Sequence, residues 1–83
     1  MNDKINYARA SETERLINLN DTGKEFITKL RYIEPDITIE EIWNDLSNFE
    51  SVTMTSDRER KILADARAIL KHEFQTRKMI ENL

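Results

Sequence analysis

The side chains best suited to chemistry are few in this chain. His72 is the only histidine and there is no cysteine, so a single chain offers neither a catalytic triad nor a zinc site built from several such ligands. Glu40 and Glu41 are adjacent acids, but adjacent residues of a helix point in different directions and do not converge on one reacting group. We therefore expect no enzyme, no metal site and no cofactor.

One run has oxygen-bearing side chains at alternate positions followed by glycine, as in the first half of a calcium-binding loop: Asn18-Leu19-Asn20-Asp21-Thr22-Gly23. The first position is asparagine instead of aspartate, and the twelfth, where a bidentate glutamate is needed, is Lys29. We interpret the run as a turn between two helices. Gly23-Lys24 lacks the other residues of a phosphate-binding loop.

Helix starts are the clearest signals in the chain. Four Ser/Thr-x-x-Glu boxes begin at Ser11, Thr22, Thr38 and Ser56. In such a box the hydroxyl accepts a hydrogen bond from an amide of the first turn, and the glutamate accepts one from the amide of the cap residue. An apolar pattern of helical period follows each box and predicts helices near residues 12–20, 24–34, 39–49 and 57–80. A fifth match, at Ser47, lies within the third helix, so it is either a chance match or a final tight turn.

Composition supports an all-α fold. One glycine, one proline and 35% charged residues favour solvated helices over hairpins. The 83 residues predict one small three- or four-helix domain, spanning residues 11–83, after an N-terminal arm or extra helical turn at residues 1–10. The lack of cysteine and of an apolar signal or membrane-spanning segment predicts a cytoplasmic protein. The abundance of Ile, Asn and Lys suits an A+T-rich genome, such as that of a phage or a low-GC bacterium.

Apolar residues at helical spacing predict the core. We expect it to contain Leu16, Ile17 and Leu19 of the first helix, Phe26, Ile27, Leu30 and Ile33 of the second, Ile39, Ile42, Trp43, Leu46 and Phe49 of the third, and Ile62, Leu63, Ala66, Ile69 and Leu70 of the fourth. Val52 and Met54, in the loop after the third helix, are further candidates for burial. Gly23 either closes the first helix or begins the second.

The last predicted helix is long, about 25 residues or nearly 40 Å. Its core-facing stripe ends near Leu70, and Glu73 and Arg77, which continue the stripe, are spaced to form an i, i+4 ion pair. Beyond Leu70 four apolar residues have no obvious place in a bundle of three short helices: Phe74, Met79, Ile80 and Leu83. We expect them to bind another chain, and a homodimer is the first candidate.

The third helix has an acidic outer face. Six acids and no Lys or Arg occur in residues 34–50, and Glu40, Glu41 and Asp45 lie on the predicted outer face. This face is either simply solvated or a docking surface for a basic partner.

The fourth helix has a basic stripe, formed by Arg60, Arg67, Lys71 and Lys78 over about 27 Å. Such a stripe could meet phosphates. However, residues 56–83 have a net charge of only +2 and residues 1–55 one of −5, whereas a nucleic-acid-binding domain is expected to be basic. A helix-turn-helix formed by the second and third helices would bring the acidic face to the major groove, so we reject it.

Our leading functional hypothesis is a non-enzymatic protein–protein interaction module, such as a small adaptor, inhibitor or regulatory protein. It would bind a protein partner and self-associate through its C-terminal helix. Two alternatives remain: a nucleic-acid-associated protein that uses the basic stripe, and an acidic decoy that blocks a nucleic-acid-binding protein. The sequence does not identify the partner.

Overall fold

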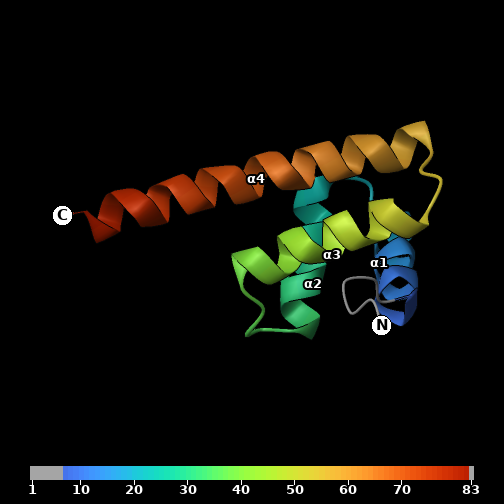
Figure 1. Cartoon of the computed structure of the whole chain (residues 1–83), viewed down its shortest axis with the longest axis horizontal. Helices are drawn as coiled ribbons and strands as arrows, with labels where there is room; N and C mark the ends of the chain where they lie inside the picture. Colours follow the sequence, from blue (N-terminus) through green and yellow to red (C-terminus); the bar gives the residue numbers. More distant parts are fainter. Residues whose placement is uncertain (1–6, 83) are drawn as a thin grey trace.

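A computed structural model of the chain describes residues 7–82, which form four helices and no strand (Figure 1). They are α1 (Tyr7–Leu19), α2 (Gly23–Ile33), α3 (Ile39–Val52) and α4 (Asp57–Glu81). The all-α fold with a long C-terminal helix is therefore confirmed. Leu83, one of the predicted partner-binding residues, lies outside the described residues, as do residues 1–6.

Hydrogen bonds confirm three of the four predicted helix starts. The hydroxyls of Thr22, Thr38 and Ser56 each accept a bond of 3.1 Å from the amide three residues later. At Thr38 and Ser56 the glutamate of the box also accepts from the amide of the cap residue, at 2.9 and 2.8 Å, which completes the capping box. Glu25, the glutamate of the Thr22 box, accepts instead from the amide of Asp21, at 2.9 Å.

The predicted helix start at Ser11 is wrong, because α1 is already helical at Tyr7 and Ser11 lies inside it. Ala10 and Thr13 are buried in this earlier part of the helix, and the Thr13 hydroxyl donates to the carbonyl of Arg9 at 3.0 Å. Packing thus extends the helix upstream of a cap-like serine. Ser47 lies inside α3, so its box is a chance match.

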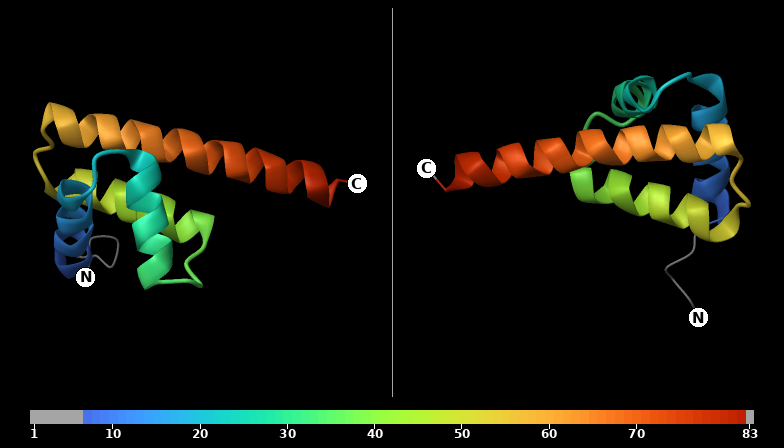
Figure 2. Two further views of the ribbon diagram at one scale, coloured as in Figure 1. Left: turned by 180° about the vertical axis from the view of Figure 1, so that it is seen from behind. Right: turned by 90° about the horizontal axis from the view of Figure 1, so that it is seen from above.

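The helices form two pairs, with α2 packed mainly on α4 and α1 mainly on α3. Figure 2 shows α3 beside the first part of α4 and antiparallel to it, with α4 extending beyond the start of the α3 helix. The radius of gyration is 13.1 Å, against roughly 12 Å expected for a compact chain of this length. The molecule is correspondingly elongated, with principal-axis extents of 41 × 34 × 22 Å.

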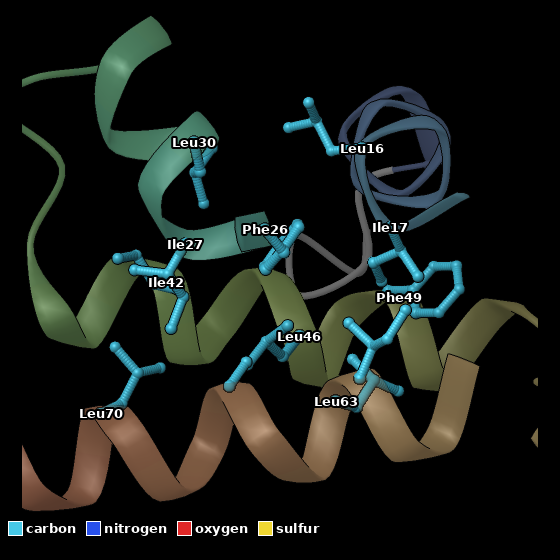
Figure 3. Packing of buried hydrophobic residues seen from close by; sticks show 12 residues of the cluster. Leu16, Ile17, Phe26, Ile27, Leu30, Ile42, Leu46, Phe49, Leu63 and Leu70 are labelled. Carbon is cyan, nitrogen blue, oxygen red and sulfur yellow. The ribbon is translucent and has the colours of Figure 1, made fainter. Parts of the chain in front are cut away.

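Twelve residues form the hydrophobic core (Figure 3): Leu16, Ile17, Phe26, Ile27, Leu30, Ile42, Leu46, Phe49, Ile62, Leu63, Ala66 and Leu70. Ile39, Trp43 and Ile69 pack against this cluster and are partly buried. Two predicted core residues are instead exposed, Leu19 (72%) and Ile33 (54%). Of the two further candidates for burial, Val52 is partly buried and Met54 is fully exposed (100%). Leu19 and Ile33 are the last residues of α1 and α2, and Met54 lies in the α3–α4 loop, so apolar character alone did not place them inside.

Gly23 begins α2 and does not close α1, and its φ is not positive. Its role is close packing. A Cβ at this position would lie 2.6 Å from the Asp65 Cβ and nearer still to the backbone nitrogen of Ala66. The first turn of α2 therefore rests directly on the backbone of α4.

The turn between α1 and α2 is tied to the start of α4. The guanidinium of Arg58 donates to the carbonyls of Ile17 and Asn20, at 3.3 and 2.6 Å, so a cation satisfies acceptors at the C-terminal end of α1. The side-chain amide of Asn20 donates to the carbonyl of Leu16 at 2.7 Å, and the side-chain amide of Asn18 donates to the carboxylate of Glu59 at 3.5 Å. The oxygen-rich run of residues 18–23 thus serves as an interhelical turn.

Candidate functional site

A groove of about 300 Å³ lies between the N-terminal half of α3 and the middle of α4. Its lining residues are Ile39, Glu40, Trp43, Leu70, Lys71, Phe74 and Gln75. This volume is at the lower end of the range for small-molecule pockets and suits one or two inserted side chains. The surface of this groove is almost entirely apolar.

The apolar part of the groove is formed by two pairs of residues, one pair on α3 and one on α4. Ile39 and Trp43 are one turn apart on α3, and Leu70 and Phe74 are one turn apart on α4, so each helix contributes side chains from one face. Leu70 is fully buried beneath them, whereas Phe74 is 38% exposed at the outer wall. Phe74, predicted to contact a partner, therefore forms part of a concave surface together with Trp43.

Cations lie over both aromatic rings. The Arg67 guanidinium carbon is 5.4 Å and the Lys71 Nζ 6.0 Å from the centroid of the Trp43 ring. Arg77 and Lys78 lie over Phe74 at 5.0 and 5.8 Å. These distances are within the range of cation–π attraction. The rim of the groove is therefore positively charged while its floor is apolar.

Two ion pairs connect α4 with α3. Arg77 contacts Glu40 at 2.6 Å, and Arg67 contacts Glu50. The hydrogen bond from Arg77 lowers the pKa of the Glu40 carboxyl and raises the pKa of Arg77 itself. Acidic residues of α3 and basic residues of α4 thus pair within one chain, although the sequence pattern showed them as two separate surfaces.

The predicted acidic face of α3 is only partly open. Asp45 has a side chain just 13% exposed and contacts Arg9 of α1 at 2.6 Å. Arg9 also contacts Glu34 at 2.6 Å, and these two carboxylates, with Asp45 foremost, raise the pKa of Arg9. Glu41 is exposed and completes the capping box. Glu40 and Asp45 are thus largely neutralised.

Only part of the predicted basic stripe of α4 is paired with carboxylates of the same chain. Arg60 pairs with Asp57 and donates to the carbonyl of Thr55 at 3.0 Å, and Arg67 pairs with Glu50. Lys71 and Lys78 have no carboxylate within ion-pair distance among residues 7–82. Two cations of the stripe therefore remain available to a partner.

The predicted pairing of Glu73 with Arg77 is wrong. Glu73 accepts two bonds from Arg31 of α2, at 2.6 and 2.9 Å, and Arg77 turns to Glu40 of α3. The bond from Arg31 lowers the pKa of Glu73. Interhelical partners offer a fixed bidentate geometry that an i, i+4 neighbour does not. Ion pairs thus continue the packing of α4 beyond Leu70.

The predicted apolar partner-binding residues do not share one face of α4. Met79 and Ile80 are 70% and 64% exposed. At about 100° per residue, Met79 lies roughly 140° and Ile80 roughly 120° around the helix axis from Phe74, on opposite sides. Phe74 belongs to the groove, whereas Met79 and Ile80 belong to the protruding end.

A second exposed apolar surface was missed by sequence reasoning. Leu19, Tyr32 and Ile33 are each more than half exposed, and Leu19 and Ile33 share a hollow with Arg15 and Lys29 between α1 and α2. The apolar pattern had placed Leu19 and Ile33 in the core. Leu19 and Ile33 are the last residues of α1 and α2. The sequence pattern does not show that the packed part of each helix stops before them.

His72, the only histidine of the chain, is exposed. Within residues 7–82 no cluster of three or more histidine or carboxylate side chains is arranged to hold a metal ion. None of the described helices is both long and apolar enough to cross a membrane. No protein-family model, curated protein or solved structure matches this chain.

Proposed function

We propose that this protein is a non-enzymatic interaction module, such as a small adaptor, inhibitor or regulatory protein, that binds a protein partner through the α3/α4 groove. The observation that carries the proposal is an exposed apolar groove, formed around Trp43 and Phe74, with ion pairs joining its two helices. The ion pairs hold α3 and α4 in place, so the groove is preformed. A preformed surface reduces the entropy cost of binding.

The composition of the groove supports a protein partner. Interface residues that contribute most to binding are enriched in tryptophan, tyrosine and arginine and sit in partly enclosed pockets. Trp43, Phe74 and Arg67 form such a cluster here. One or two apolar side chains of a partner would fill the available volume.

The protruding end of α4 is the proposed site of self-association. Met79 and Ile80 are exposed there, and a second copy of the same segment would cover them in a homodimer with a shared helical interface. We place the protein in a reducing compartment such as the cytoplasm, since it has no cysteine.

Nothing in the structure specifically favours the two alternatives. An acidic decoy would need Glu40 and Asp45 free, and both are engaged by arginines of the same chain. A nucleic-acid surface would need the whole basic stripe, yet Arg60 and Arg67 are already paired.

The experiment compares proteins that co-purify with the tagged wild-type chain and with two variants, from the organism that encodes it. Phe74→Asp places a charge in the groove, whereas Tyr32→Asp, at an aromatic residue of α2 that is 81% exposed and does not line the groove, is the matched control. Circular dichroism confirms folding of each. We expect a specific partner to be lost with Phe74→Asp and retained with Tyr32→Asp. The same partners at the same yield with both variants would contradict the proposal.

A further inference from the structure

The charge around the groove is unbalanced. Four cations surround it, Arg67, Lys71, Arg77 and Lys78. Two carboxylates, Glu40 and Glu50, are paired with the two arginines, and a third, Glu81, attracts Arg77 without forming an ion pair. The ammonium groups of Lys71 and Lys78 thus lie on the rim over aromatic rings, without a carboxylate partner among residues 7–82. A binding partner with carboxylates at the matching positions would form ion pairs with these two ammonium groups.

The two lysines have a defined spacing. They are seven residues apart on α4, which corresponds to two helical turns and about 10.5 Å along the axis, on the same face. Another helix lying alongside α4 presents residues i and i+7 at this same spacing. Phe74 and the opening of the groove lie between the two lysines, where a residue at i+3 or i+4 of that helix would enter.

We propose, as an extension of the interaction function above, that the groove binds an acidic amphipathic helix of a partner protein. Two carboxylates of this helix, seven residues apart, contact Lys71 and Lys78. A large apolar side chain between them inserts over Trp43 and against Phe74. The apolar residue fills the groove, and the paired charges set the register of the bound helix.

Other occupants fit these observations less well. A basic helix would bring cations to a rim that already has two unpaired lysines. A nucleic acid would meet only those two lysines and would leave the apolar floor uncovered. In a second copy of this chain, the exposed Met79 and Ile80 directly follow Arg77 and Lys78, so their insertion would bring like charges together.

Trp43 provides the reporter, because it is the only tryptophan of the chain. The probe is a tryptophan-free synthetic helix with glutamates at i and i+7 and leucines at i+3 and i+4, titrated into the full-length protein. Two control peptides replace the glutamates by lysine or the leucines by alanine. Lys71→Glu and Lys78→Glu test the contacts, and Lys61→Glu, an exposed lysine of α4 outside the groove, is the matched control.

We expect a saturable change in Trp43 emission with the acidic peptide. Either control peptide, or either groove variant, should weaken binding about tenfold or more, whereas Lys61→Glu should leave it unchanged. The proposal is overturned if no saturation occurs up to about 1 mM peptide, if the lysine peptide binds as tightly, or if single-stranded DNA produces the same response. If the acidic peptide fails while Phe74→Asp still loses a cellular partner, only this inference falls and the interaction function remains.

Discussion

Gly23 determines how closely two helices approach. Its missing side chain lets the first turn of α2 rest on the α4 backbone at Asp65 and Ala66. Any Cβ would have to displace backbone atoms, which cannot yield as a flexible side chain can. Glycine at position 23 thus sets the distance between α2, which contains Arg31, and α4, which forms one wall of the groove.

Gly23→Ala should destabilise the fold by about 1–3 kcal/mol, the usual cost of overpacking. Ordinarily alanine would stabilise a helix relative to glycine, so the sign of the effect is diagnostic. Urea denaturation followed by circular dichroism gives the free energy of unfolding, with Lys24→Ala at the next, exposed position as control. Equal or greater stability of Gly23→Ala would contradict the close contact.

Glu73 makes stability depend on pH. Its hydrogen bonds from Arg31 lower its pKa below the ordinary value of 4.5, so the unfolded chain takes up this proton more readily than the folded one. The contribution of Glu73 to stability is therefore complete at pH values well above 4.5 and is lost as pH falls through the lowered pKa. Both partners are about one-third exposed, so the contribution is at most about 1 kcal/mol.

Glu73→Gln should accordingly be less stable than the wild type at neutral pH, and the difference should vanish on acidification. Denaturation curves between about pH 3 and pH 7 measure it, since this range covers the titration of carboxylates. Glu14→Gln, at a glutamate of α1 outside these ion pairs, is the matched control. A difference between Glu73→Gln and wild type that stays constant across the range would rule out the ion pair as its origin.

At the scale of the helix, α4 has three consecutive parts with different roles. Its first part, with Ile62 and Leu63, is buried in the core. Its middle part is fixed to α2 and α3 by the ion pairs of Glu73 and Arg77 and forms one wall of the groove. Its last turns, with Met79 and Ile80, are largely exposed. We therefore propose that self-association and partner binding use different parts of this helix.

The variant Met79→Glu/Ile80→Glu separates these roles. Both side chains are exposed in one chain, so the free energy of unfolding of the isolated domain should change little. We expect the double variant to sediment as a monomer at concentrations where the wild type is a dimer, because charges replace the apolar contacts. Analytical ultracentrifugation decides this. If the wild-type chain is monomeric at all accessible concentrations, the proposed homodimer is contradicted.

At the scale of the whole molecule, local signals in the sequence predicted the fold well. The boxes at Thr22, Thr38 and Ser56 are hydrogen-bonded caps, and the apolar stripes behind them form the core. Capping and periodicity depend on residues within a few positions of each other, so one sequence suffices to read them. The helix start predicted at Ser11 was wrong because the packing of Ala10 and Thr13 extends α1 upstream of Ser11.

Charge partners could not be predicted in the same way. The ion pairs Arg9–Asp45, Arg31–Glu73 and Arg77–Glu40 join residues more than 35 positions apart, and only the packed helices bring them together. The acidic face and the basic stripe consequently looked unpaired in the sequence. The groove was also hidden, because Trp43 and Phe74 come from separate helices and had been assigned to the core and to a partner surface.

The Trp43 indole tests most directly whether the α3/α4 groove binds a protein partner, as we propose. As the only tryptophan, it gives a single indole N–H signal in a two-dimensional ¹H–¹⁵N spectrum of the labelled chain. On addition of the purified partner we expect this signal to shift saturably, together with the amides of Ile39 and Phe74. An unchanged Trp43 signal, with shifts confined to Leu19, Tyr32 and Ile33 on the α1/α2 surface, would contradict the claim.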